Sequence, residues 1–136
     1  TDMTIFFRLL SNFSADTVGL KMVEQAFYNL KDLTGTTKSR WNHWFDKYRA
    51  RLHKETQSQQ QRKNKMDAIN PKYVLRNYMA QLAIDAADKK DYALINELFE
   101  LLKKPYSEQP EKEKWFAKRP DWAKNKIGCS MLSCSS

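Results

Sequence analysis

Residues 70–89 constrain the fold more than any other part of the chain. Their apolar side chains recur at helical spacing on nearly every side, and the polar ones form one narrow stripe of Asn77, Gln81, Asp85 and Asp88. A helix with so little polar surface is covered by neighbouring elements. We therefore expect a central helix that Asn70 caps, with Pro71 at the first helical position, where its missing N–H costs nothing.

Similar spacing predicts further helices on both sides of this one. The capping residues that the sequence offers are Asp2, then Ser14 or Asp16, then Thr37 or Ser39, and finally Asp91. The short link at Lys89 and Lys90 predicts an antiparallel hairpin of the last two helices, and Pro105 ends the second of them. With only 3 Gly and 4 Pro, the chain is poor in turn residues. We expect an all-α fold, a small helical domain of about five helices with an irregular C-terminal tail.

A chain of 136 residues is long enough for one hydrophobic core, so we expect residues 1–136 to form a single domain. The chain starts without an initiator Met, which suggests a piece of a longer protein. Residues 54–65 are rich in Gln and Lys and hold no large apolar side chain. We expect a flexible polar segment there, either a solvated loop or a frayed helix end. Residues 123–136 are expected to form an exposed, flexible tail that contains both cysteines.

The net charge of +8 is compatible with nucleic acid, an anionic membrane or an acidic protein as partner. No apolar run approaches the ~18 residues that span a bilayer, so we expect no membrane partner. Trp41, Trp44, Phe45 and Tyr48 lie among basic residues, as in a platform that stacks nucleic-acid bases. Because the four aromatic residues follow the core period of a helix, we interpret them as core, and we predict that Trp44 is buried.

The sequence contains no convincing catalytic pattern. Its three glycines are scattered, so no phosphate-binding loop is expected. His43 and His53, combined with Cys129 and Cys134, lack the paired spacing of a structural zinc site. By itself, this chain is therefore expected to be neither an enzyme nor a binder of a metal or cofactor.

Arg76 is the one basic residue in the predicted central helix that deserves a specific hypothesis. On a helix it shares a face with Tyr73 and with three alanines, so a neighbouring element can approach closely. A guanidinium there would be partly buried and would need a carboxylate or carbonyl partner. An internal ion pair is the favoured interpretation. The alternative is a contact with another domain.

Ordered blocks along nearly the whole chain resemble the C-terminal part of the selenoprotein O family, whose bacterial name is YdiU. The blocks are TIFFRLLS (4–11), YRARL (48–52), NPKYVLRNY (70–78), AIDAA (83–87), DY (91–92), PYSEQP (105–110), PDW (120–122) and SCSS (133–136). The resemblance implies a parent protein with a kinase-like (pseudokinase) domain that transfers AMP from ATP to protein hydroxyl groups, using Mg²⁺ or Mn²⁺. The partners it implies are that N-terminal domain and the protein substrates, and it implies a cytoplasmic location of bacterial type.

The resemblance also implies a redox role for the tail. Cys134 occupies the family position that holds Cys in many bacterial members and selenocysteine in others. That residue is thought to pair with a cysteine of the catalytic domain. Cys129 has no clear family counterpart, and a local bond between Cys129 and Cys134 is the alternative. Two further interpretations stay open: a basic helical module that binds nucleic acid or an acidic protein, and a purely structural helical cap.

Overall fold

The computed structural model describes residues 1–14, 16–126 and 128–129. Over these residues the secondary structure consists of six α-helices and four short 3-10 helices, with no strand, which confirms the all-α class. The chain forms two compact units, Thr1–Lys72 and Tyr73–Ser136, here called unit 1 and unit 2. That the whole chain is one domain stays a prediction.

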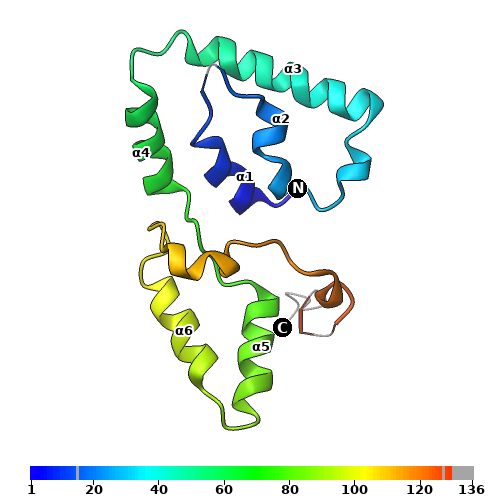
Figure 1. Ribbon diagram of the computed structural model, residues 1–136, viewed down its shortest axis with the longest axis vertical. Helices are drawn as coiled ribbons and strands as arrows, with labels where there is room; N and C mark the ends of the chain where they lie inside the picture. The colour runs from blue at the N-terminus through cyan, green and yellow to red at the C-terminus, as the bar shows by residue number, and fades with distance from the viewer. Residues whose placement is uncertain (15, 127, 130–136) are drawn as a thin grey trace, which may run out of the picture. The chain divides into compact units, whose positions relative to one another are not determined.

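Unit 1 contains four α-helices and two 3-10 helices (Figure 1). They are α1 (Met3–Leu10), α2 (Gly19–Met22), η1 (Glu24–Ala26), η2 (Leu30–Asp32), α3 (Gly35–Leu52) and α4 (Gln59–Ile69). The predicted cap of the first helix is confirmed, because Asp2 Oδ1 accepts a hydrogen bond of 3.1 Å from the Ile5 backbone N–H. The helix buries Ile5, Phe6 and Leu10, as its apolar spacing predicts.

The prediction of one continuous second helix is wrong. Instead of one helix from Ser14 or Asp16, the chain forms α2, η1 and η2 with bends between them. The extended backbone of Phe27 (ψ 130°) lets its ring meet Trp41 edge-on, with the centroids 5.2 Å apart. Burial of that ring outweighs continued helical hydrogen bonding. Helix α3 also begins earlier than predicted, at Gly35, which adopts a left-handed φ of +49°.

The aromatic stripe of α3 forms part of the core of unit 1, but its four rings are not equally buried. Phe45 is 2% exposed and stacks on Phe13 with the centroids 5.6 Å apart. Trp44 is 38% exposed and stacks its ring on Tyr48 at 5.2 Å. The prediction of Trp44 as a fully buried core residue is therefore wrong, because the helix turns Phe45 inward and leaves Trp44 on the margin of the core.

Residues 54–65, for which we expected a solvated loop or a frayed helix end, are helical from Gln59 onward, in α4. Their flexibility stays a prediction. Ser58 opens the helix with a capping box, in which Ser58 Oγ accepts from the Gln61 N–H and Gln61 Oε1 accepts from the Ser58 N–H. The buried Arg62 donates to the Phe13 carbonyl, so a cation helps to hold the helix against the rest of unit 1. Arg8, 5% exposed, donates to the carbonyls of Asp67 and Asn70 at 3.0 and 3.1 Å.

Unit 2 contains α5 (Asn77–Ala87), α6 (Ala93–Leu102), η3 (Pro110–Trp115) and η4 (Asp121–Ala123). The central helix starts seven residues later than Asn70, which is instead the residue that ends α4. Tyr73 explains the difference. Its N–H donates to the Pro105 carbonyl at 3.0 Å and its hydroxyl donates to the Glu108 carbonyl at 2.6 Å, so the chain before α5 is held in a non-helical form.

The predicted hairpin of the last two helices is confirmed as α5 and α6, which run antiparallel in Figure 1. The turn between them places Lys90 in the left-handed region at a φ of 64°, and the Asp91 N–H donates back to the Ala86 carbonyl. Asp91 Oδ1 accepts from the Ala93 N–H at 3.0 Å, as expected of a residue that starts a helix.

Candidate functional site

Residues 122–126 of unit 2 contact α5 at and beside its polar stripe. The Trp122 ring meets the buried Tyr78 edge-on, with the centroids 6.3 Å apart. Lys126 Nζ donates to Asp85 Oδ2 at 2.6 Å, and Gln81 Nε2 donates to Asp85 Oδ1 at 2.7 Å. The stripe that made α5 conspicuous in the sequence therefore attaches the following segment to the helix.

The electrostatics of this attachment favour the charged form of both partners. The hydrogen bond from Lys126, with a smaller contribution from Gln81, lowers the pKa of Asp85 below its usual value. The same hydrogen bond raises the pKa of Lys126. Both groups are solvent-accessible, so the pair contributes orientation more than stability.

Cys129 is buried next to this attachment, with 4% of its surface exposed, and its thiol is free. Its N–H donates to the Lys126 carbonyl at 3.1 Å. Gly128 makes the turn before it, with a φ of +86°, and a Cβ at this position would overlap Gln81 Oε1. The expectation of an exposed tail is therefore wrong for Cys129. Cys134 lies outside the described residues.

Arg76 is half-buried and stands immediately before α5, in extended backbone at a φ of −102° and a ψ of 150°. It is not part of the helix, so the predicted face shared with Tyr73 and the alanines does not form. The reason is the anchoring of Tyr73 described above, which keeps residues 73–76 out of the helix. The internal ion pair of Arg76, and its alternative, a contact between Arg76 and another domain, both stay predictions.

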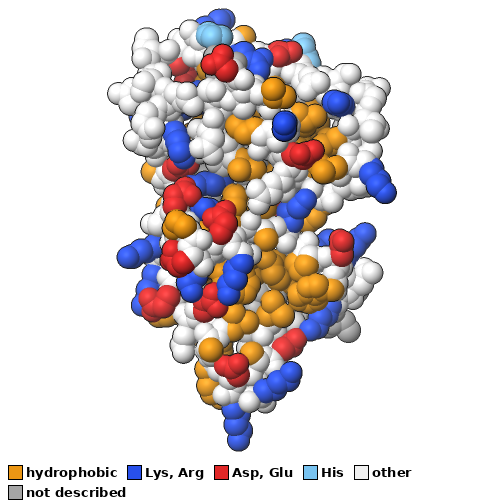
Figure 2. All heavy atoms as spheres, viewed as in Figure 1, with side chains coloured by type: hydrophobic (Ala, Val, Ile, Leu, Met, Phe, Trp, Pro, Cys, Tyr) orange, Lys and Arg blue, Asp and Glu red, His pale blue; other side chains and the backbone are white. Residues whose placement is uncertain are grey.

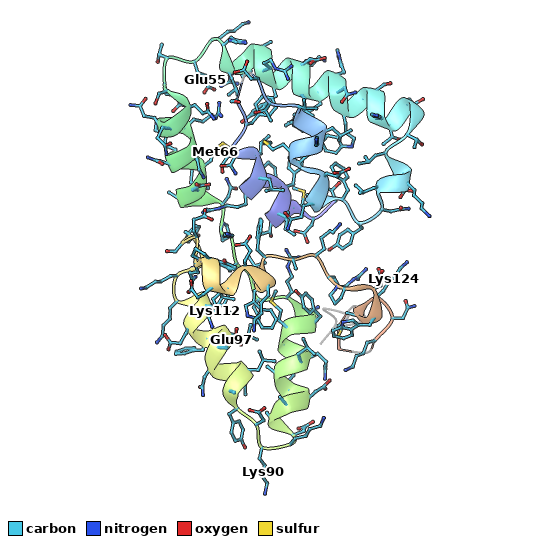
Figure 3. The ribbon with its side chains drawn as sticks, viewed as in Figure 1. Glu55, Met66, Lys90, Glu97, Lys112 and Lys124 are labelled. Carbon is cyan, nitrogen blue, oxygen red and sulfur yellow. The ribbon has the colours of Figure 1, made fainter. Side chains whose placement is uncertain are left out.

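A second polar cluster in unit 2 surrounds Glu97 on α6, which Figure 3 labels together with Lys112. Glu97 Oε1 accepts from Trp115 Nε1 at 3.0 Å and pairs with Lys114 and Lys112 at 2.8 and 3.3 Å. These donors, Lys114 first and Trp115 next, lower the pKa of Glu97 from 4.5 to about 2. The cluster fixes η3 on α6 and buries Trp115, a role that the sequence pattern did not indicate.

The aromatic rings of unit 1 are engaged mainly with one another. Trp41 lies 5.5 Å from Phe6 and 5.2 Å from Phe27, and Trp44 lies 5.0 Å from Phe45, measured between centroids. In addition, Trp44 stacks on Tyr48 and Phe45 stacks on Phe13, so these ring faces are not available for stacking with bases. The arrangement therefore fits the predicted core stripe better than a nucleic-acid platform.

In the part of the chain that the structure describes, no group of three or more His, Cys, Asp or Glu side chains could hold a metal ion. Over the same residues, no helix combines the length and the apolar character that a membrane span requires. The polar clusters around Asp85 and Glu97 join one chain segment to another. The described residues thus define an all-α chain whose charged clusters join its segments.

Comparison with known proteins identifies the family. The family model described as "Protein adenylyltransferase SelO" matches residues 1–103. The protein nucleotidyltransferase YdiU of Flavobacterium johnsoniae is 60% identical over 139 residues, which cover 100% of this chain and 27% of that relative. The YdiU proteins of Aromatoleum aromaticum and Rhodopirellula baltica are 45% and 43% identical, over 99% and 100% of this chain and 26% and 28% of their own lengths. The chain belongs to the SelO family, and it spans about a quarter of the length of these relatives.

Proposed function

We propose that this chain is the non-catalytic C-terminal domain of a SelO-type protein adenylyltransferase. The observation that carries the proposal is the family match over residues 1–103, in a chain that corresponds to only 27% of its Flavobacterium relative. In the parent protein, a kinase-like domain outside this chain transfers AMP from ATP to hydroxyl side chains of proteins. The parent acts in the cytoplasm, and this domain supports the catalytic one.

The residues of this chain do not fit the group that the reaction requires. Mg²⁺ with ATP phosphates needs carboxylates at the metal and a glycine-rich loop or helix start at the phosphates. The described residues offer no such metal cluster, and the three glycines of the sequence are far apart. We therefore assign ATP and Mg²⁺ or Mn²⁺ to the rest of the parent and derive no chemical step from this chain.

The regulatory part of the proposal concerns Cys134. In the oxidised state its Sγ forms a disulfide with a cysteine of the catalytic domain, and two protons and two electrons pass to a disulfide oxidant. A dithiol reductant reverses the step. The burial of Cys129 supports this assignment, because a thiol that is 4% exposed is a poor partner for exchange, which needs access to an attacking thiolate.

Activity measurements on the parent and on the isolated chain test the proposal. The isolated chain should transfer no AMP to protein, whereas the parent should do so with ATP and Mg²⁺. Reductant should raise the activity of the wild-type parent, and Cys134→Ser should be active without reductant. Cys129→Ser is the matched control and should keep the wild-type response. AMP transfer by the isolated chain would refute the non-catalytic role, and an equal response of all three proteins would refute the switch.

One observation favours a second function, a basic module that binds an acidic protein. Residues 1–72 hold 13 Lys and Arg against 7 Asp and Glu, which leaves a net charge of +6 on unit 1. Nucleic acid is the less suitable partner because Phe45 is buried and Trp44 is stacked on Tyr48. An oligonucleotide that binds the isolated chain with a steep salt dependence would overturn this preference.

A further inference from the structure

Unit 1 has an apolar groove between α1 and α3 with a volume of about 590 Å³. The residues that form most of its wall are Met3, Phe6, Phe7, Arg40, Trp41 and Trp44. Met3 is 62% exposed, and Phe7 and Trp44 are both more than a third exposed. A groove of this volume is in the range of ligand-binding pockets, so it has room for at least one large apolar side chain. In Figure 2, hydrophobic side chains also reach the visible surface of unit 1 between charged ones.

A line of cations continues from the groove along α3. Arg40 lies in the groove wall, and Lys47 follows Trp44 by three residues on the same helix face. Both side chains are exposed, and within the described residues neither forms a hydrogen bond or an ion pair. Unit 1 as a whole has a net charge of +6, so this face attracts an acidic partner.

We propose that the groove holds an apolar side chain from an acidic segment in the rest of the parent protein, with carboxylates of that segment paired to Arg40 and Lys47. The inference rests on the proposed function, because it places the catalytic part of the parent outside this chain. The relatives match this chain over its full length and have more than two thirds of their own length elsewhere. A covalently linked segment reaches millimolar effective concentration, so even a modest groove is occupied.

The same charges disfavour a second copy of this chain as occupant. A symmetric pair would bring Arg40 and Lys47 of two copies to one interface, where like charges repel. The spacing of the two cations also restricts the acidic segment. Seven residues of helix span ~10 Å, so the paired carboxylates lie about two helical turns apart, or about three residues apart in an extended segment.

Hydroxyl-radical labelling with mass spectrometry tests the proposal on the intact parent and on the isolated chain. Met3, Phe7 and Trp44 should be labelled in the isolated chain and lose most of that labelling in the parent. The double variant Arg40→Glu with Lys47→Glu should restore labelling of the groove in the parent. The matched control is Lys21→Glu with Lys31→Glu, which reverses two exposed cations outside the groove and should leave the groove protected.

Each other outcome overturns the inference. Equal labelling of the groove in parent and isolated chain means that nothing in the parent covers it. Protection that survives the Arg40 and Lys47 reversal means that the occupant is not acidic. Labelling that falls as the isolated chain is concentrated assigns the groove to a second copy. AMP transfer by the same parent is measured separately, so an exposed groove in an active parent refutes the inference and leaves the proposed function intact.

Discussion

Gly19 lies against the ring of Phe45 so closely that an alanine there should destabilise unit 1. A Cβ added to Gly19 would have three ring carbons of Phe45 as its nearest neighbours, the farthest only 2.8 Å away. Phe45 is 2% exposed and stacked on Phe13, so its ring cannot move aside without disturbing the core. The absence of a side chain at Gly19 is therefore what allows α2 to approach α3.

The expected change in the free energy of unfolding follows from two competing effects of Gly19→Ala. Overpacking of a core costs about 1–3 kcal/mol. The better helix propensity of Ala returns at most about 1 kcal/mol. We expect a net loss of about 1–2 kcal/mol in the wild type. Phe45→Ala alone should cost about 3–5 kcal/mol. In the Phe45→Ala background the ring is gone, so Gly19→Ala should be neutral or slightly stabilising, which gives a coupling of about 2 kcal/mol.

Urea unfolding followed by circular dichroism at the helical band measures the four free energies of this cycle. Gly35→Ala is the matched control. Gly35 has a positive φ, and a Cβ there would meet nothing within 4 Å, so its cost is backbone strain and should be the same with or without the Phe45 ring. If Gly19→Ala costs the same in both backgrounds, or stabilises the wild type, the close packing of α2 on Phe45 is not the reason for glycine at this position.

Trp44→Ala should cost about 1–2 kcal/mol in urea unfolding, clearly less than Phe45→Ala, because more than a third of the Trp44 side chain is already exposed. The charged form of Glu97 stabilises the fold fully above pH 4.5, and this contribution is lost as the pH falls through its folded pKa of about 2. The free energy of unfolding of Glu97→Gln should therefore fall by about 1 kcal/mol less than that of the wild type as the solution is acidified. Identical pH profiles of unfolding for the two proteins would contradict this. The buried thiol of Cys129 should react slowly with an aromatic disulfide reagent until denaturant is added. The control variant Cys129→Ser should lack this slow phase. Rapid reaction of Cys129 in the folded chain would show that the thiol is accessible.

The local signals of the sequence were sufficient for the fold class and for several helix ends. Asp2 and Asp91 act near helix starts as their residue types indicate, and the link at Lys90 makes the expected hairpin turn. These features are decided within a few residues by hydrogen bonds to neighbouring backbone groups, so the sequence alone contains them. The family resemblance also lies in the order of short blocks, and it agrees with the matched family.

The sequence did not reveal which polar residues hold the segments together. Arg62 and Arg8 are bonded to carbonyls about 50 or more residues away in the chain, and Lys126 is bonded to Asp85 across 41 residues. Such pairs leave no periodic trace, because one charged residue on a helix has the same pattern whether it is solvated or buried against a distant carbonyl. The polar composition of residues 54–65 therefore indicated only a solvated loop or a frayed helix end. The local capping box of Ser58 and Gln61 starts α4, and the tertiary bond of Arg62 holds it in place.

What the sequence by itself determined is the all-α class, most of the buried apolar positions of α1 and the family to which the chain belongs. What only the tertiary structure decided is that the predicted core rings of α3 are unequally buried, Phe45 fully and Trp44 in part, and where Asn70 and Tyr73 end one helix and delay the next. The physical reason for the delayed helix is the anchoring of Tyr73. Helical propensity differs by less than about 1 kcal/mol among most residues, whereas burial of one aromatic ring with its hydrogen bonds is worth several times more.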